Sequence, residues 1–211
     1  MGTLPRLATG VCFALLALTL GCASAPSQGL HTTPPTLGAL PYSDADVDFM
    51  SGMIPHHAQA VIMAGWCDSH GARKDVATLC GRIVVAQRDE IKLMQQWLSD
   101  RGLPVPDATS TKHHMKMPNG MEHDMLMPGM LSPEQLARLD KARDAEWDRL
   151  FLTFMIGHHE GAIKMVDELF GSYGAMQDED IFKFASDMYA DQTTEIERMQ
   201  KMLSAPEQRS R

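Results

Sequence analysis

The feature that most constrains the fold is an internal repeat that spans most of the chain. Residues 46–63 (DVDFMSGMIPHHAQAVIM) and 148–165 (DRLFLTFMIGHHEGAIKM) share Asp, Phe, Met, Ile, His, His, Ala and Met in register at an offset of 102. A second match, at an offset of 105, aligns Gln87, Glu90, Ile91 and Met94 with Gln192, Glu195, Ile196 and Met199. Each half is therefore a two-element unit, and the fold must be one that two such units complete together.

Both elements of each unit are predicted to be helices. Apolar residues recur at three- and four-residue steps, and Gly/Asn turn clusters are missing inside the periodic segments. Ser132-Pro133-Glu134-Gln135 combines a cap, a first-turn proline and a capping-box glutamine. The expected helices cover residues 43–70, 74–100, 132–170 and 178–203. Neither hairpin can bury its apolar face alone, so we predict an all-α four-helix bundle made of two repeated helical hairpins.

The chain divides into five segments on this interpretation. They are a signal peptide (1–21), a flexible tether (22–42), the first helical hairpin (43–100), a Met/His-rich connection (101–131) and the second helical hairpin (132–204). The apolar run from Leu7 to Leu20 is too short for a transmembrane helix, and it indicates export.

Two cleavage sites compete at the end of the signal segment. Leu18-Thr19-Leu20-Gly21-Cys22 is typical of a bacterial lipobox, although Thr19 stands where leucine is usual. Cleavage after Ala25 is the alternative, but Pro26 would then follow the cut. We favour lipidation of Cys22, which predicts a periplasmic lipoprotein that touches the membrane only through its lipid anchor. The alternative is a free periplasmic product.

The charge of the chain excludes one class of partner, and its cysteines suggest one covalent bond. The formal net charge of −8 becomes −9 once Arg6 leaves with the signal, and no basic patch is available for nucleic acid. Cys12 leaves with the signal and Cys22 is taken by lipid, which leaves Cys67 and Cys80. Outside the reducing cytoplasm this pair is a candidate disulfide that would staple the first hairpin, with two buried free thiols as the alternative.

One face of the repeated helix carries soft metal-ligand side chains. At about 100° per residue, the ligand-type residues of each copy fall within an arc of roughly 140°. The first copy presents Met50, Met53, His56, His57 and Met63. The second presents Met155, His158, His159 and Met165, with Leu152 in place of the first methionine. The two faces could meet in the bundle or form two equivalent sites.

The connection carries a third cluster of the same residue types. Six of the 17 methionines and three of the nine histidines lie in residues 113–130. Prolines and glycines without apolar periodicity predict a loop there. Exposed methionines have no packing reason to gather, so metal capture is the better explanation. The candidate ligands are His113, His114, Met115, Met117, Met121, His123 and Met125.

The ligand types favour copper, and methionine in particular favours Cu(I) over Zn(II), Mg(II) or Ca(II). Methionine is also a common core filler, but paired histidines on the same stripe, twice over, argue for ligands. Pro55 and Gly157 precede the two His pairs and predict a local opening or kink of each helix. Glu90 and Glu195 either accept hydrogen bonds from the imidazoles or are solvated polar positions.

The repeated pattern Asp-x-x-Phe-x-x-x-Met-Ile-x-His-His-x-x-Ala-[Val/Ile]-x-Met, followed by Gln-x-x-Glu-Ile-x-x-Met, resembles the bacterial family called domain of unknown function 305, over residues 44–203. The resemblance implies a ferritin-like helical bundle linked to periplasmic copper. It also implies ligation by the repeated residues of the two copies, namely Met53, His56, His57, Met63, Met155, His158, His159 and Met165.

Together these patterns predict an envelope copper-binding protein that sequesters or chaperones Cu(I), without catalytic turnover. Copper ions, and another envelope copper protein, are the expected partners. One alternative is a ferritin-like di-metal oxidase, but that chemistry needs Glu-x-x-His on two helices, and neither His pair has a glutamate at that spacing. The other is a structural envelope lipoprotein whose methionines scavenge oxidants, a role that would not need paired histidines.

Overall fold

A computed structural model describes residues 42–116 and 122–205 of the chain. For residues 113–116 and 122–124 it describes the backbone alone. The signal segment, Cys22, nearly all of the tether, Met117 and Met121 lie outside these ranges. Within them, no helix has the length and apolar character needed to cross a bilayer.

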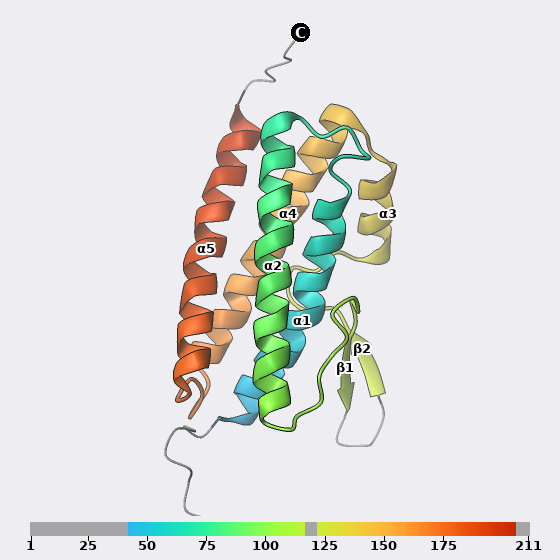
Figure 1. Ribbon diagram of the computed structural model, residues 1–211. Coiled ribbons are helices and arrows are strands. Elements are labelled where there is room, and N and C mark those ends of the chain that lie inside the picture. The colour runs from blue at the N-terminus through green and yellow to red at the C-terminus, as the bar shows by residue number, and fades with distance from the viewer. Residues whose placement is uncertain (1–41, 117–121, 206–211) are drawn as a thin grey trace, which may run out of the picture. The chain divides into compact units, whose positions relative to one another are not determined.

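Four long helices form the predicted all-α bundle (Figure 1). The first hairpin consists of α1 (Asp44–Gly65) and α2 (Lys74–Asp100), and the second of α4 (Asp144–Phe170) and α5 (Glu179–Ser204). A short helix α3 (Pro133–Lys141) precedes α4. Capping boxes at Ser43 and Ser132 begin α1 and α3, as their sequences predict.

The single helix expected over residues 132–170 is wrong, because the chain breaks between α3 and α4. Asp144 adopts a left-handed φ of 52°, and its backbone N–H donates to the His70 carbonyl at 2.8 Å. At the end of α3 the Asp140 carbonyl lies 2.6 Å from Arg143 Nη1 and 3.0 Å from His70 Nε2. The contacts of His70, in the turn after α1, and of the neighbouring Arg143 side chain thus replace helical hydrogen bonds. Local periodicity does not reveal a partner as distant as His70.

The connection contains more order than the predicted loop. Strands β1 (His113–Lys116) and β2 (Glu122–Met125) pair antiparallel, with His113 opposite Met125 and Met115 opposite His123 in the backbone register. The hairpin signal was present in the sequence, because Asn119-Gly120 separates the two runs.

Two apolar clusters fill the bundle, one toward each end. The C-terminal half of α1 packs with the N-terminal half of α4 around Met63, Trp147 and Phe151. The N-terminal half of α1 packs with the C-terminal half of α4 around Phe49 and Met165. Helices α1 and α4, which we call the central helices, are therefore antiparallel. Both His-His pairs lie where the two clusters meet.

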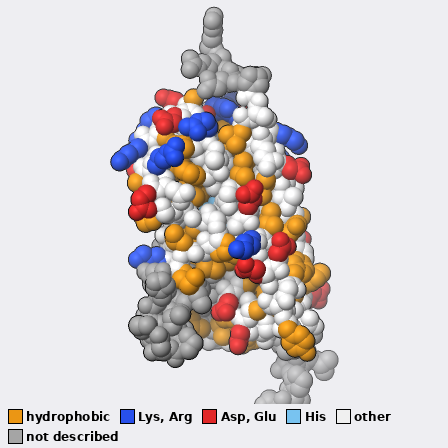
Figure 2. All heavy atoms as spheres, turned by 180° about the vertical axis from the view of Figure 1, so that it is seen from behind, with side chains coloured by type: hydrophobic (Ala, Val, Ile, Leu, Met, Phe, Trp, Pro, Cys, Tyr) orange, Lys and Arg blue, Asp and Glu red, His pale blue; other side chains and the backbone are white. Residues whose placement is uncertain are grey.

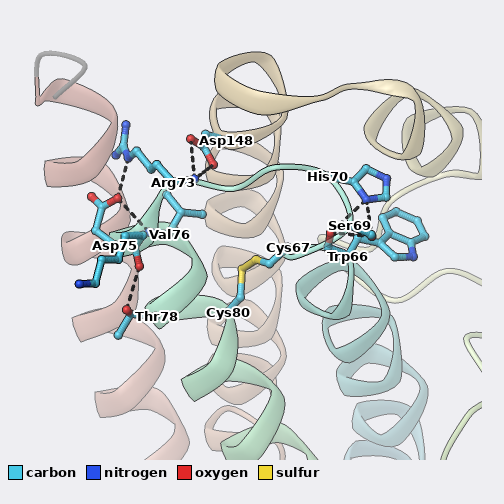
Figure 3. The surroundings of a disulfide bond; sticks show 11 residues. Trp66, Cys67, Ser69, His70, Arg73, Asp75, Val76, Thr78, Cys80 and Asp148 are labelled. Carbon is cyan, nitrogen blue, oxygen red and sulfur yellow. Dashed lines mark hydrogen bonds and ion pairs between the residues drawn. A yellow bond between two sulfur atoms is a disulfide. The ribbon is translucent and has the colours of Figure 1, made fainter. Parts of the chain in front are cut away.

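The candidate disulfide is present. Cys67, in the turn after α1, is bonded to Cys80 on α2, and both residues are buried (Figure 3). The closed loop is short, with a sequence separation of 13, and holds the turn of the first hairpin. The equivalent positions in the second hairpin have no cysteines.

Two equivalent aspartates tie the hairpins to each other. Asp46 on α1 accepts the backbone N–H of Met176, in the turn of the second hairpin, at 2.9 Å. Asp148 on α4 accepts the backbone N–H of Arg73, in the turn of the first hairpin, at 3.2 Å (Figure 3). The repeated aspartate thus has the same task in both copies, which is to hold the opposite hairpin's turn.

Replacing Asp46 should destabilise the whole bundle. Asp46→Ala removes this cross-hairpin bond and the two 2.8 Å bonds that the carboxylate accepts from Ser43. We expect a loss of about 1.5–3 kcal/mol in the free energy of unfolding, measured by urea denaturation followed by circular dichroism. Asp89→Ala is the control, because its ion pair with Lys92 is exposed and should cost at most about 1 kcal/mol. Equal losses in the two variants would contradict this role.

Candidate metal centre

Four histidines meet at the crossing of α1 and α4. His56 and His57 come from α1, His158 and His159 come from α4, and all four side chains are fully buried. The rings of His56 and His158 lie with their centroids 3.8 Å apart, at an interplanar angle of 42°. The two repeated faces therefore meet in one centre. Figure 2 shows almost no histidine surface on the face that it displays, in keeping with this burial.

The outer helices hold the second histidine of each pair. His57 Nε2 lies 2.7 Å from Glu90 Oε2 on α2, and His159 Nε2 lies 2.7 Å from Glu195 Oε2 on α5. The two repeated glutamates therefore make the same contact in both copies. They accept hydrogen bonds from the imidazoles and are not solvated polar positions. A carboxylate that accepts the imidazole N–H orients the ring and leaves its other nitrogen free for a ligand.

The first histidine of each pair has a different environment. His56 Nε2 lies 3.0 Å from the Pro128 carbonyl, which can only accept, so Nε2 carries the proton of the neutral ring. His158 has no hydrogen-bond partner on either ring nitrogen within the described residues. The Nδ1 atoms of His56, His57 and His159 are likewise buried without a partner there. Each such atom costs about 1–3 kcal/mol.

Burial keeps the two central imidazoles neutral. It lowers the pKa of His56 to about 3, with a further lowering from neighbouring His57. Burial also lowers the pKa of His158 well below its usual range, helped by the adjacent His56 and His159. A neutral imidazole has a lone pair, and this is the form that binds metal ions.

Thioethers flank the histidines on both sides. The five methionines predicted as bundle ligands are buried, with Met63 and Met155 in one apolar cluster and Met50, Met53 and Met165 in the other. These buried positions serve the packing of the core. Pro55 lies inside an α1 that runs without interruption from Asp44 to Gly65, so the expected opening of that helix is not seen.

The sequence did not predict the segment that covers the centre. We call residues 127–131 the strap, since they run from the hairpin to α3 across both central helices. The Pro128 carbonyl lies against His56, and Gln59 on α1 forms two hydrogen bonds with the Leu131 backbone, at 3.0 and 2.7 Å. In the sequence repeat Gln59 aligns with Gly161. This difference between the two copies was the signal from which a segment crossing the helices could have been inferred.

The described side chains do not contain a ready-made metal site of nitrogen, thiolate and carboxylate ligands. Among them, no group of three or more His, Cys, Asp or Glu residues is placed to hold a metal ion. A metal at the centre therefore needs thioether ligands or a small rearrangement of the imidazoles. For His113, His114, Met115 and His123 only the backbone register is described, Met117 and Met121 lie outside the described residues, and Met125 is exposed.

Solved structures with the same fold provide a comparison. A DUF305 fragment from Deinococcus radiodurans is 26% identical, with a TM-score of 0.63 over 77% of this chain and 97% of that one. CopM in its Cu(II)-bound form is 27% identical, with a TM-score of 0.57 over 75% and 95% of the two chains. CopM is also known in Cu(I)-bound and Ag-bound forms.

A secreted-type DUF305 protein from Streptomyces coelicolor matches with a TM-score of 0.62 over 76% of this chain and 92% of that one. Its identity is 24%, which shows the fold alone. Among curated proteins, an uncharacterized protein of Acanthamoeba polyphaga mimivirus is 33% identical over 58 residues. That match covers 28% of this chain and 38% of the viral protein.

The model of the domain of unknown function DUF305 matches residues 46–203, which include both His-His helices and both glutamate-bearing helices. This range covers nearly all of the bundle, from the first repeated aspartate to the last turn of α5. The chain belongs to the DUF305 family.

Proposed function

We propose that this protein binds copper as Cu(I) in the cell envelope, and that it sequesters or chaperones the ion without catalytic turnover. The observation that carries the proposal is the buried centre of four imidazoles, whose Nδ1 atoms have no partner among the described residues. Thioethers lie on both sides of it. Neutral nitrogen and sulfur donors suit a soft monovalent cation.

The family comparison supports copper as the metal. CopM, at 25–27% identity, has been solved with Cu(II) and with Cu(I). Silver, bound in another CopM structure, is also a soft cation.

The di-metal oxidase alternative fits the centre less well. The two glutamates that reach it, Glu90 and Glu195, each accept from a histidine. Ferritin-like di-iron sites instead use glutamates from all four helices. The oxidant-scavenging alternative leaves the buried imidazoles without a role.

Location and partners extend the proposal. The signal segment indicates export, and the lipobox favours a lipid on Cys22 as the membrane contact, with a free periplasmic product as the alternative. Another envelope copper protein is the expected donor or acceptor of the ion. Because the histidines are fully buried, copper reaches them through local opening of the bundle.

Copper binding is tested by anaerobic titration of Cu(I) into the purified exported chain in the presence of a chromogenic Cu(I) competitor. We expect the protein to withdraw Cu(I) from the competitor, because it offers thioether and imidazole donors. Zn(II) with a zinc indicator is the control and should bind more weakly, by about tenfold or more, because thioether ligands disfavour it. Failure to withdraw any Cu(I) would rule out the proposed function.

Two variants separate the centre from the hairpin. The first replaces His56, His57, His158 and His159 by Ala; the second replaces the Met and His residues of 113–125 by Ser and leaves the strap intact. We expect each variant to lose part of the Cu(I) stoichiometry, with circular dichroism confirming that both remain helical. Full stoichiometry and affinity in the folded histidine variant would assign those residues a structural role.

The glutamates should tune the affinity of the centre. Glu90→Gln combined with Glu195→Gln keeps an acceptor near each imidazole and removes the negative charge. We expect Cu(I) affinity to fall about 10- to 100-fold, the usual effect of losing a carboxylate that orients a ligand histidine. Glu160→Gln is the matched control, since Glu160 is exposed and directly follows His159. An equal effect of the two changes would contradict orientation by Glu90 and Glu195.

A further inference from the structure

The two copies of the repeat differ where they face the strap. At an offset of 102, Gly52 corresponds to Phe154 and Gln59 to Gly161. Gly52 lies close to Met127, and Gln59 holds Leu131. Gly161, in the second copy, lies against Gly129. These differences between the two copies therefore allow a single strap to pack against both α1 and α4.

Gly161 on α4 and Gly129 in the strap let their backbones approach each other closely. A Cβ atom on Gly129 would lie 2.5 Å from the Gly157 carbonyl oxygen and 2.8 Å from the Gly161 Cα, and Gly129 has a φ of +78°. A Cβ atom on Gly161 would lie 2.5 Å from the Gly129 Cα. The two backbones thus touch at a distance that only glycine permits.

Hydrogen bonds to α1 fix the other side of the strap. Gln59 holds the Leu131 backbone through both amide atoms, and His56 holds the Pro128 carbonyl. The backbone N–H of Met127 donates to the sulfur of Met130 at 3.3 Å. With its neighbours held in this way, Met127 has a defined position over α1.

The side chain of Met127 meets that of Met165 at Gly52. A Cβ atom at Gly52 would lie 2.7 Å from Met127 Cε, 3.4 Å from Met127 Sδ and 3.7 Å from Met165 Cε. Helical side chains lean toward the N-terminus, so the imidazole of His56, one turn later, covers the turn that contains Gly52. The ends of the Met127 and Met165 side chains therefore meet beside Gly52, one turn before His56 on α1.

We infer that Met127, Met165 and His56 form a binding site for a soft monovalent cation, Cu(I) or Ag(I). The inference rests on the proposed function and specifies where a cation binds. His56 supplies the nitrogen that Pro128 leaves free, and the methionines supply neutral sulfur ligands. The strap thereby brings a ligand from the Met-rich connection into the bundle. The site is asymmetric, because Phe154 fills the position of Gly52 in the second copy.

The test uses the exported chain with methyl-labelled methionine, titrated anaerobically with Ag(I) and followed by NMR. Met127→Leu and Met165→Leu assign the two methyl signals. We expect both signals to shift together with the same equivalent of Ag(I). Met188, a buried methionine of the same apolar cluster as Met165, serves as the control, and its signal should not shift at that equivalent.

Three variants then test affinity in the Cu(I) competition. Met127→Leu should weaken one binding event about tenfold or more, whereas Met188→Leu, an equally conservative change in the core, should not. Gly52→Ala changes no ligand atom but displaces the Met127 terminus, so it should weaken the same event.

The outcomes distinguish the two proposals. If other methionine signals shift while those of Met127 and Met165 stay in place, the site is wrong and copper binding stands. If Met127→Leu and Met188→Leu have equal effects on affinity, the site is also wrong. If the wild-type protein withdraws no Cu(I) and no signal shifts with Ag(I), the proposed function itself fails.

Discussion

The contact between the rings of His56 and His158 lies at the centre of the bundle, and the surrounding elements are arranged around it. Two imidazoles 3.8 Å apart in a fully buried space must remain neutral, since a charge there would lack solvation. Their neighbours His57 and His159 are held by glutamates from α2 and α5. The strap covers His56. The outer helices and the connection thus orient a polar core that apolar packing alone would not stabilise.

Repetition and asymmetry have different roles in this chain. The residues that the two copies share form the features that occur twice. These are the aspartate hydrogen bonds to the opposite turn, the His pairs and the His–Glu contacts. The residues that differ between the two copies form the contacts that occur in only one copy. Gly52, Gln59 and Gly161 accommodate or hold the strap, and Cys67 and Cys80 staple one hairpin only. The internal repeat therefore predicts the symmetric frame, and its mismatches mark the unique contacts.

The sequence predicted most of the fold because its signals are local or repeated. Helical periodicity, the Ser43 and Ser132 caps and the offset between the two His pairs each follow from short stretches of chain. The break before Asp144 was missed because its causes lie on His70, far away in the sequence. The strap was missed for the same reason, since Pro128 meets His56 across 72 residues. Contacts of this kind leave no periodic trace.

Contacts near the ends of the bundle stabilise the fold, whereas unpaired polar atoms in its middle destabilise it. Near the ends, Asp46 and Asp148 bind the opposite turns, Cys67–Cys80 closes one hairpin, and Arg101 pairs with Asp178 beside Trp97. In the middle, several buried ring nitrogens lack partners among the described residues, at about 1–3 kcal/mol each. Because a bound cation would use those lone pairs, the centre gains most from binding. The contacts near the ends would keep the helices in register while a cation enters. Under the proposed function, uptake then requires movement of the strap and its neighbours and leaves the helical frame folded.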